Sequence, residues 1–312
     1  MTLARALELA ERGRGTTHPN PVVGAVVVSD GEVVGEGWHK RKGGPHGEVA
    51  ALQAAGERAL GATLYTTMEP CTHHGDTPPC TKAILEAGVA RVVAGALDPN
   101  PKAGGGLEEL SAAGVDVELI DSFEARAQNE AWRTWVSQGR PFVTYKAAMT
   151  LDGRLTLPGE RWISGEESRR LVHELRAASD AVAVGMGTVT ADDPKLTARD
   201  VGAANQPRRL AFGRGPLPEG SDLELRTEPL ADELAALASE GVQLLLLEGG
   251  PTLAAAFFRE DLIDKLLVFA APKVSGEGPT LFQDGVPPRP VTRLQARPVG
   301  QDVLLSAYVH EP

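Results

Sequence analysis

The sequence predicts two α/β domains, and three observations indicate that fold class. The chain has 312 residues, which is long enough to form two hydrophobic cores. Short apolar segments alternate with segments whose apolar residues recur at helical spacing, and this alternation continues through both halves. Gly139-Arg140-Pro141 interrupts the alternation, so we expect one domain over residues 1–140 and another over residues 141–312.

The first half alternates helices and strands at short intervals. We expect helices over residues 2–14, 46–60, 80–86, 107–113 and 122–138, and strands over residues 22–28, 33–39, 63–68, 91–96 and 115–120. Asp30-Gly31 lies between the first two strands and is typical of a hairpin turn. The spacing of the other elements predicts a three-layer α/β/α sandwich around a mostly parallel sheet.

The second half repeats the alternation without cysteines. We expect strands over residues 142–149, 180–184, 208–212, 242–247 and 266–271, and helices over residues 166–178, 230–239 and 253–258. The segment 198–229 is rich in Pro, Gly and charge, so we expect loops around one strand there. Residues 291–309 alternate well enough to predict two antiparallel strands.

The composition excludes several classes of partner. The net charge is −11, and both halves are mildly acidic, so bulk charge argues against nucleic-acid binding. No apolar run approaches the roughly 20 residues that a membrane-spanning helix needs. The first fifteen residues carry scattered charges and no apolar core of a signal peptide. We therefore expect a cytoplasmic protein that binds no membrane.

One broken stretch carries a metal-ligand pattern. It supplies His46 and Glu48 and, further along, Cys71 and Cys80, which are the only two cysteines of the chain. One imidazole and two thiolates, with a fourth position left open, form the ligand set of a catalytic zinc site. Prolines precede both His46 and Cys80, which places these two ligands at helix starts, and a helix N-terminus favours the thiolate of Cys80. Glu48 is then the candidate that transfers protons beside the metal.

Two other interpretations of these residues stay open. Cys71 and Cys80 would form a disulfide in an oxidising compartment, which a cytoplasmic location disfavours. A structural zinc site would need a fourth protein ligand, which His73 or His74 could supply. A cysteine pair separated by eight residues also departs from nucleoside and nucleic-acid deaminases, in which two residues separate the cysteines.

The first half resembles the deaminase half of the bifunctional riboflavin-biosynthesis deaminase–reductase family, whose fold is cytidine-deaminase-like. The matching segments are 18–21 (HPNP), 45–48 (PHGE), 69–80 (EPCTHHGDTPPC) and 98–101 (DPNP). Gly47 is a departure, since the family usually has Ala there, and a glycine costs a helix start up to about 1 kcal/mol. It would remove a methyl group beside the substrate but no ligand, so we expect activity to survive.

The second half resembles the reductase domain of the same family, whose fold is dihydrofolate-reductase-like. The matching segments are 146–154 (KAAMTLDGR), 162–164 (WIS), 175–176 (LR), 187–194 (GTVTADDP), 196–199 (LTAR) and 248–253 (EGGPTL). The resemblance implies NADPH contacts at Trp162, Thr188, Asp192, Gly250, Pro251, Thr252, Leu253, Ala254, Ala255 and Ala256. It implies substrate contacts at Arg176, Leu196, Arg199 and Glu248, and the two arginines could clamp a phosphate.

The resemblance implies two consecutive reactions on a small phosphorylated pyrimidine. A zinc-dependent deamination, assisted by Glu48 and with Asn20 and His39 seating the pyrimidine, would precede reduction of the ribosyl group by NADPH. Lys146, Asp152 and Glu248 are the polar candidates for an acid in the second step. Arg214 follows a predicted strand and is interpreted as a contact to the 2′-phosphate of NADPH. A homo-oligomer is left open.

Two classes of protein compete with this interpretation. One is a deaminase of free nucleosides or polynucleotide bases joined to an unrelated domain, against which the acidic charge and the long cysteine spacing argue. The other is a binding module that zinc holds together. A plain dinucleotide-binding dehydrogenase is disfavoured because the sequence contains no G-x-G-x-x-G segment.

Overall fold

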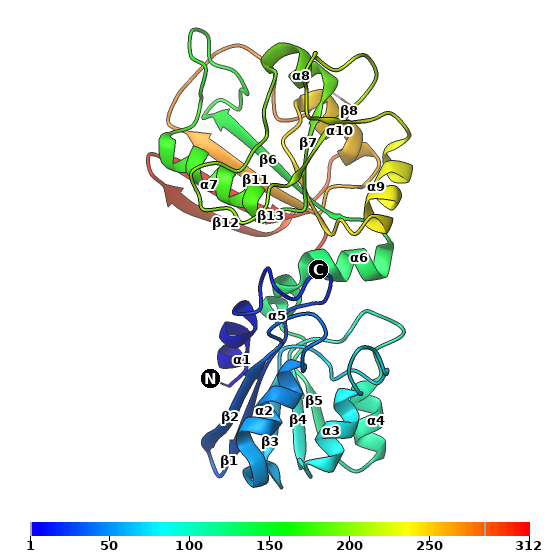
Figure 1. The fold of residues 1–312 in the computed structure, drawn as a ribbon. Coiled ribbons are helices and arrows are strands. Elements are labelled where there is room, and N and C mark those ends of the chain that lie inside the picture. The colour runs from blue at the N-terminus through cyan, green and yellow to red at the C-terminus, as the bar shows by residue number, and fades with distance from the viewer. Residues whose placement is uncertain (1, 284) are drawn as a thin grey trace. The chain divides into compact units, whose positions relative to one another are not determined.

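The computed structural model describes residues 2–283 and 285–312, which form two compact units. The first unit ends at Gln138 and the second begins at Gly139 (Figure 1). Each unit is built around its own β-sheet. Within the described residues, none of the helices has the length and apolar character needed to cross a membrane.

The first unit contains a five-stranded sheet in the order β2-β1-β3-β4-β5. Its elements are α1 (Thr2–Glu11), β1 (Gly24–Ser29), β2 (Glu32–Trp38), α2 (Gly47–Ala55), the 3₁₀ helix η1 (Gly56–Ala59), β3 (Thr63–Thr66), α3 (Cys80–Glu86), β4 (Arg91–Ala94), α4 (Gly106–Ala112), β5 (Asp116–Leu119), α5 (Phe123–Gln128) and α6 (Glu130–Gln138).

The predicted hairpin is present, and the predicted mostly parallel sheet has one exception in this unit, which is β1. β1 pairs antiparallel with both β2 and β3, so β2, β3, β4 and β5 all point in the same direction. Asp30 and Gly31 form the turn, both with positive φ (52° and 79°). A two-residue turn cannot hold a crossover helix, so β1 and β2 must be antiparallel.

Helices cover both faces of this sheet, which confirms the three layers. Alternate residues of β1 divide between the faces: Val26 packs with Ala6 and Leu9 of α1, whereas Ala25 and Val27 pack with α2. On the α2 side, β2 carries glycines, and a Cβ at Gly37 would lie 2.3 Å from the backbone nitrogen of Ala51. Glycine therefore lets α2, which carries His46 at its N-terminus, lie directly on β2.

The helix predicted over residues 122–138 is two helices, α5 and α6, separated at Asn129. The Asn129 side chain accepts a hydrogen bond from the backbone N–H of Val22 and donates one to the Val22 carbonyl, both at 2.9 Å. These bonds anchor the chain at the break, where Asn129 caps the end of α5 with a non-helical backbone (φ −118°, ψ 28°). Beyond the break, α6 places Trp132 against Val23 and Met68.

The second unit contains an eight-stranded sheet in the order β12-β13-β11-β6-β10-β7-β8-β9. Its elements are β6 (Phe142–Thr150), α7 (Glu166–Ala177), β7 (Ala181–Gly185), α8 (Met186–Asp192), β8 (Arg208–Phe212), β9 (Glu224–Arg226), α9 (Leu230–Ser239), β10 (Leu244–Leu247), α10 (Pro251–Arg259), β11 (Lys265–Ala271), β12 (Thr292–Val299) and β13 (Asp302–Tyr308).

The sequence predicted most of this sheet but not all of it. The antiparallel pair β12–β13 is confirmed. Segment 198–229 contains two strands rather than one, because the three-residue β9 adds to the edge of the sheet beside β8. Residues 186–192, for which no helix was predicted, form α8.

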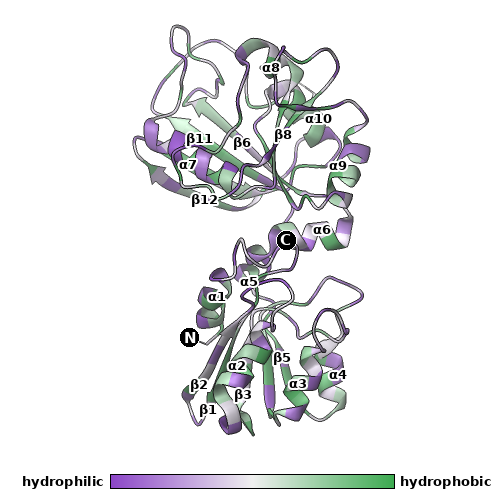
Figure 2. Ribbon diagram, in the orientation of Figure 1, coloured by the Kyte–Doolittle hydropathy of each residue, from purple (hydrophilic) through white to green (hydrophobic). Residues whose placement is uncertain are grey.

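Helices also lie on both faces of the second sheet. Leu245 and Leu247 of β10 share a cluster with α9 and α10, and Leu246 faces the opposite side, where α8 packs. In Figure 2 the central strands are largely hydrophobic, whereas the hydrophilic residues lie mostly in helices and loops. β7 and β10 are parallel neighbours, so the helices that follow them, α8 and α10, both begin at the carboxyl edge of the sheet.

Candidate active sites

Three predicted metal ligands meet in the first unit. His46 is the N-cap of α2, Cys80 is the first residue of α3, and Cys71 lies in the loop that follows β3. His46 Nδ1 lies 3.2 Å from Cys80 Sγ and 3.5 Å from Cys71 Sγ, and all three ligand atoms lie within 4.8 Å of one another. Tetrahedral zinc with ordinary bond lengths separates such nitrogen and sulfur atoms by roughly 3.5 Å. The donor set and its spacing therefore fit Zn²⁺.

The alternatives for the cysteines do not match the structure. Both cysteines are free thiols, so they do not form a disulfide. His73 and His74 are exposed and do not belong to the group of ligand atoms found among the described residues. A three-ligand set leaves the fourth position of a tetrahedral ion open, as catalytic zinc sites require.

The thiolate that the protein favours is Cys71 rather than Cys80. Hydrogen bonds from the Cys80 thiol, from His46 and from the backbone N–H of Cys80 lower the pKa of Cys71 to about 4. The first amide of α3 thus points at Cys71 Sγ, at 3.4 Å. The pKa of Cys80 is raised instead, because its thiol donates to Cys71 and is buried. The predicted role of Cys80 as a thiolate ligand at a helix N-terminus stays a prediction for the zinc-bound protein.

Glu48 is the second residue of α2, in its first turn, and is the most unusual carboxyl group of the site. It is 3 % exposed, and its Oε2 atom is buried without a hydrogen-bond partner among the described residues. Burial raises the pKa of Glu48 to about 7. A carboxyl group in this state can both accept and donate a proton near neutral pH.

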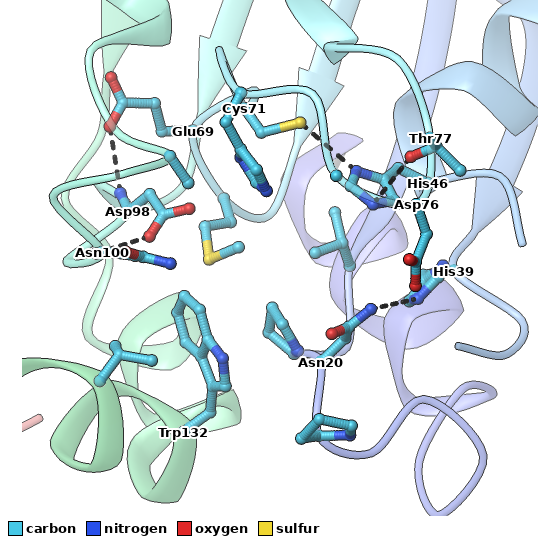
Figure 3. A pocket seen from close by; sticks show the side chains of 18 of the residues that line it. Asn20, His39, His46, Glu69, Cys71, Asp76, Thr77, Asp98, Asn100 and Trp132 are labelled. Atoms are coloured by element: carbon cyan, nitrogen blue, oxygen red, sulfur yellow. Dashed lines mark hydrogen bonds between the residues drawn. The ribbon is translucent and has the colours of Figure 1, made fainter. Parts of the chain in front are cut away.

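His46, Glu48 and Cys71 line a cavity of about 360 Å³. Asn20 and His39 line the same cavity. His39 Nδ1 lies 3.0 Å from the Pro45 carbonyl, which can only accept, so Nδ1 carries the proton. Nε2 is then free to accept from Asn20 Nδ2 at 3.5 Å (Figure 3). Burial lowers the pKa of His39, so the neutral ring dominates near pH 7. The cavity therefore presents a polar wall opposite the apolar surface of Trp132.

Three other residues of this cavity, Asp98, Asn100 and Trp132, were not assigned a role by sequence analysis. Asp98 accepts from the Asn100 backbone N–H at 2.8 Å, and burial together with the Glu69 charge raises the Asp98 pKa to about 6. Glu69 holds this loop by accepting from the backbone of Asp98, Gly105 and Leu107. The match of segment 98–101 to the family pattern indicated that this segment matters. Its distance in sequence from the zinc ligands did not indicate that it lies beside them.

Gly47 does not face the cavity in the way the sequence suggested. A Cβ built on Gly47 would lie 2.6 Å from the Val23 carbonyl oxygen, next to β1. The missing methyl group therefore lies between α2 and the sheet rather than beside a substrate. Its absence lets the start of α2 approach the backbone of the central sheet.

The second unit contains a buried charge cluster around Glu248. Arg176 binds Glu248 through two hydrogen bonds of 2.6 and 3.0 Å, and Lys146 Nζ lies 3.2 Å from the same carboxylate. Burial opposes the charge, but attraction to Lys146 and Arg176 outweighs it and lowers the pKa of Glu248 to about 2. Arg176 is therefore already paired, and a clamp of two free arginines with Arg199 does not describe this arrangement.

The remaining predicted cofactor residues cluster at the carboxyl edge of the second sheet. Gly250 is the N-cap of α10, and a Cβ on it would lie 3.6 Å from Thr188 Oγ1 of α8. Two helix N-termini thus meet at one place, and such a place attracts anionic groups such as a pyrophosphate. Within the segment 250–256, Ala254 and Ala255 are fully buried, so their side chains belong to the core.

The other predicted residues of this unit differ in exposure. Asp192 ends α8 and is exposed, as is Trp162, which lines a separate hollow of about 440 Å³. Leu196 is only 3 % exposed, so its side chain packs in the core. Arg214 is exposed just beyond β8, the neighbour of β7.

Fold and site together define a zinc-dependent deaminase domain of the cytidine deaminase type, followed by a dihydrofolate-reductase-like reductase domain. Residues 1–96 match the cytidine and deoxycytidylate deaminase zinc-binding region, and residues 141–305 match the RibD C-terminal domain. The chain belongs to the riboflavin biosynthesis protein RibD family, whose members combine a deaminase with an NADPH-dependent reductase.

Individual relatives match over nearly the whole length. The riboflavin biosynthesis protein RibD of Aquifex aeolicus is 43 % identical, with 90 % of this chain and 89 % of that protein covered. The RibD structure from Acinetobacter baumannii superposes with a TM-score of 0.85 at 36 % identity, covering 98 % and 97 % of the two chains. A diaminohydroxyphosphoribosylaminopyrimidine deaminase/5-amino-6-(5-phosphoribosylamino)uracil reductase from Thermotoga maritima gives a TM-score of 0.82 at 34 % identity, again covering 98 % and 97 %.

Proposed function

We propose that the first unit removes the 2-amino group of 2,5-diamino-6-(5-phosphoribosylamino)pyrimidin-4(3H)-one by hydrolysis. Water adds its oxygen to the ring carbon, the C–N bond breaks, and ammonia leaves. The observation that carries this proposal is the unpaired, buried Oε2 of Glu48 beside three ligand atoms that fit zinc. When bound by His46, Cys71 and Cys80, Zn²⁺ would lower the pKa of a water ligand toward neutrality.

In this proposal the chain's own groups orient the base and move the protons. Glu48 takes a proton from the attacking water and delivers it to the departing nitrogen, which its pKa of about 7 allows in both directions. Asn20, oriented by the neutral His39, binds a polar edge of the pyrimidine. Trp132 offers an aromatic surface to the ring. Asp98 and Asn100 offer further polar contacts across the cavity from Asn20.

For the second unit we propose NADPH-dependent reduction of the deaminated product to 5-amino-6-(5-phosphoribitylamino)uracil. Hydride from NADPH reaches C1′ of the sugar, and a proton completes the conversion of the ribosyl group to ribityl. The paired helix N-termini near Thr188 and Gly250 support a site for the cofactor's phosphates, and Pro251, Thr252, Leu253 and the exposed Asp192 belong to the same two helices. Arg199 and the Lys146–Arg176–Glu248 cluster support a substrate site beside it.

Arg214 is proposed to bind the 2′-phosphate of NADPH. Its position just beyond β8 places it at the same sheet edge as α8 and α10. Arg214→Ala should lower the preference for NADPH over NADH, measured as the ratio of kcat/KM values. An unchanged ratio would show that another group recognises this phosphate.

One experiment tests both activities. The zinc-loaded protein is given the diaminopyrimidine ribosyl phosphate with and without NADPH, and ammonia and NADPH are followed separately. We expect ammonia in both reactions and NADPH oxidation only after deamination. Absence of ammonia in both reactions would sink the proposal, and turnover of cytidine or single-stranded DNA would instead favour a deaminase of nucleosides or polynucleotides.

A further inference from the structure

The segment 196–199 of the second unit is held in place by side chains from outside it. Leu196 has a positive φ of 50° and a buried side chain, which fixes an unusual turn in the backbone. The next residue, Thr197, presents its carbonyl oxygen to α7. There it accepts from His173 Nδ1 at 2.9 Å and from Arg176 Nη1 at 3.2 Å.

A second set of hydrogen bonds holds Ala198, the residue after Thr197. The Gln206 side chain accepts from the Ala198 backbone N–H and donates to the Ala198 carbonyl, both at 2.8 Å. One amide side chain thus satisfies both polar backbone groups of Ala198. With Leu196 anchored in the core and Thr197 bonded to α7, three consecutive residues have little conformational freedom.

Arg199 emerges directly from this fixed segment. Its side chain is exposed and forms no ion pair within the described part of the chain. It lies close enough to His173 to influence that ring electrostatically, as Arg176 and Glu248 also do. Arg176 and Lys146 both pair with Glu248, whereas Arg199 forms no ion pair among the described residues and is the cation that remains available for an anionic ligand.

The protonation of His173 follows from its neighbours. A carbonyl oxygen can only accept, so the 2.9 Å contact with Thr197 requires the proton on Nδ1. The Arg199 backbone N–H lies 3.3 Å from the same nitrogen and cannot also donate to it in that state. The short contact therefore identifies His173 as a donor that holds the Thr197 carbonyl.

We propose that His173 is a positioning residue of the reductase, which fixes the segment 196–199 so that Arg199 meets the phosphate of the ribosyl substrate. This inference rests on the proposed reductase function and adds a residue that neither the sequence motifs nor the ligand contacts assign. Preorganising a long arginine side chain lowers the entropic cost of binding, so the effect should appear mainly in KM.

The test compares two substitutions of His173 in the full-length enzyme. Asparagine can place an N–H near the position of Nδ1, whereas alanine removes the donor. Loss of this partly buried hydrogen bond predicts a rise of up to about tenfold in KM for the deaminated ribosyl phosphate in His173→Ala. We expect kcat to change by less than about threefold, the KM for NADPH to stay constant, and His173→Asn to retain most of the wild-type KM.

Three controls separate positioning from a general loss of structure. Arg170 lies on α7 with an exposed side chain, so Arg170→Ala should leave kcat and both KM values unchanged. Ammonia release by the first unit serves as an internal control in the same polypeptide. In an Arg199→Ala background, His173→Ala should add less than about twofold to KM, because both residues act through one contact.

The possible results are distinct. An unchanged KM in a folded His173→Ala enzyme, equal losses in the alanine and asparagine variants, or additive effects with Arg199→Ala would each overturn the proposal. If His173→Ala does not fold, His173→Asn and Gln206→Met provide the test, with a wild-type KM in Gln206→Met counting against it. Failure of the reductase proposal itself would look different, since the wild-type enzyme would then oxidise no NADPH with this substrate.

Discussion

Replacing Glu48 by glutamine removes one proton-transfer group and almost nothing else. The two side chains have the same shape, and the three metal ligands are untouched. No other carboxyl group of the cavity can substitute for it: Glu69 is occupied by three backbone amides, Asp98 by the Asn100 amide, and Asp76 is exposed. General acid–base catalysis contributes about 10²- to 10⁴-fold. With no substitute, we expect kcat for ammonia release to fall about 10³-fold, or roughly 4 kcal/mol in activation free energy.

The assay measures ammonia release by zinc-loaded Glu48→Gln with saturating diaminopyrimidine ribosyl phosphate. Zinc content is determined in parallel and should stay equal to that of the wild type. Asp76→Asn is the matched control, because it removes an exposed carboxylate from the same cavity and should change kcat by only a few fold. The reductase should be unaffected when supplied with deaminated substrate. A zinc-loaded Glu48→Gln enzyme that keeps kcat within about tenfold of the wild type would refute the role of Glu48.

Three further predictions concern the metal, the buried charge cluster and the start of α2. Cys80→Ser should lose zinc and ammonia release while NADPH-dependent reduction of deaminated substrate continues, and retained zinc at wild-type affinity would contradict the ligand assignment. Because the pKa of Glu248 is lowered from 4.5 to about 2, its carboxylate stabilises the fold above pH 4.5 and loses this effect as the pH falls toward 2. Glu248→Gln should therefore lower the free energy of unfolding by about 3 kcal/mol at pH 7 and by less near pH 3 in urea titrations; an equal loss at both pH values would exclude the charge as the cause. Gly47→Ala should destabilise by about 1 kcal/mol in the same assay, because overpacking against the Val23 carbonyl outweighs the gain in helix propensity, and a stabilised variant would contradict this.

Periodicity predicted the elements whose structure is determined locally. The helices over residues 80–86 and 230–239 and the strand over 208–212 have the predicted bounds. In each of these elements, the apolar residues that set the period and the proline or glycine residues that end it lie within a few positions of one another in sequence. The antiparallel pairing of β1 with β3 and the break at Asn129 were not predicted. The Asn129 side chain anchors this break by bonding Val22, which is 107 residues away in sequence.

The metal ligands were likewise recognisable from local sequence, whereas the rest of the site depends on contacts between distant segments. Two cysteines in 312 residues are rare enough that their position beside a P-C and an H-x-E segment indicates zinc chemistry. Asp98 and Trp132 are common residue types, and only the packing of their loop and helix around the cavity makes them part of the site. The segment 98–101 matched the family pattern without assigning Asp98 a role, and no motif marked Trp132 as different from an ordinary core aromatic.

Charged residues show most clearly why a motif alone does not define a role. Arg176 and Arg199 both lie in family segments, and the sequence treats them as equivalent candidates for a phosphate. In the structure, Glu248, which is 72 residues from Arg176 in sequence, neutralises that arginine through two hydrogen bonds. Arg176 then binds the Thr197 carbonyl and helps to fix the turn from which Arg199 emerges. The role of each arginine thus depends on which carboxylate the fold brings to it, and this partner is determined by the pairing of β10 with β7 and the packing of α7 rather than by residues near either arginine.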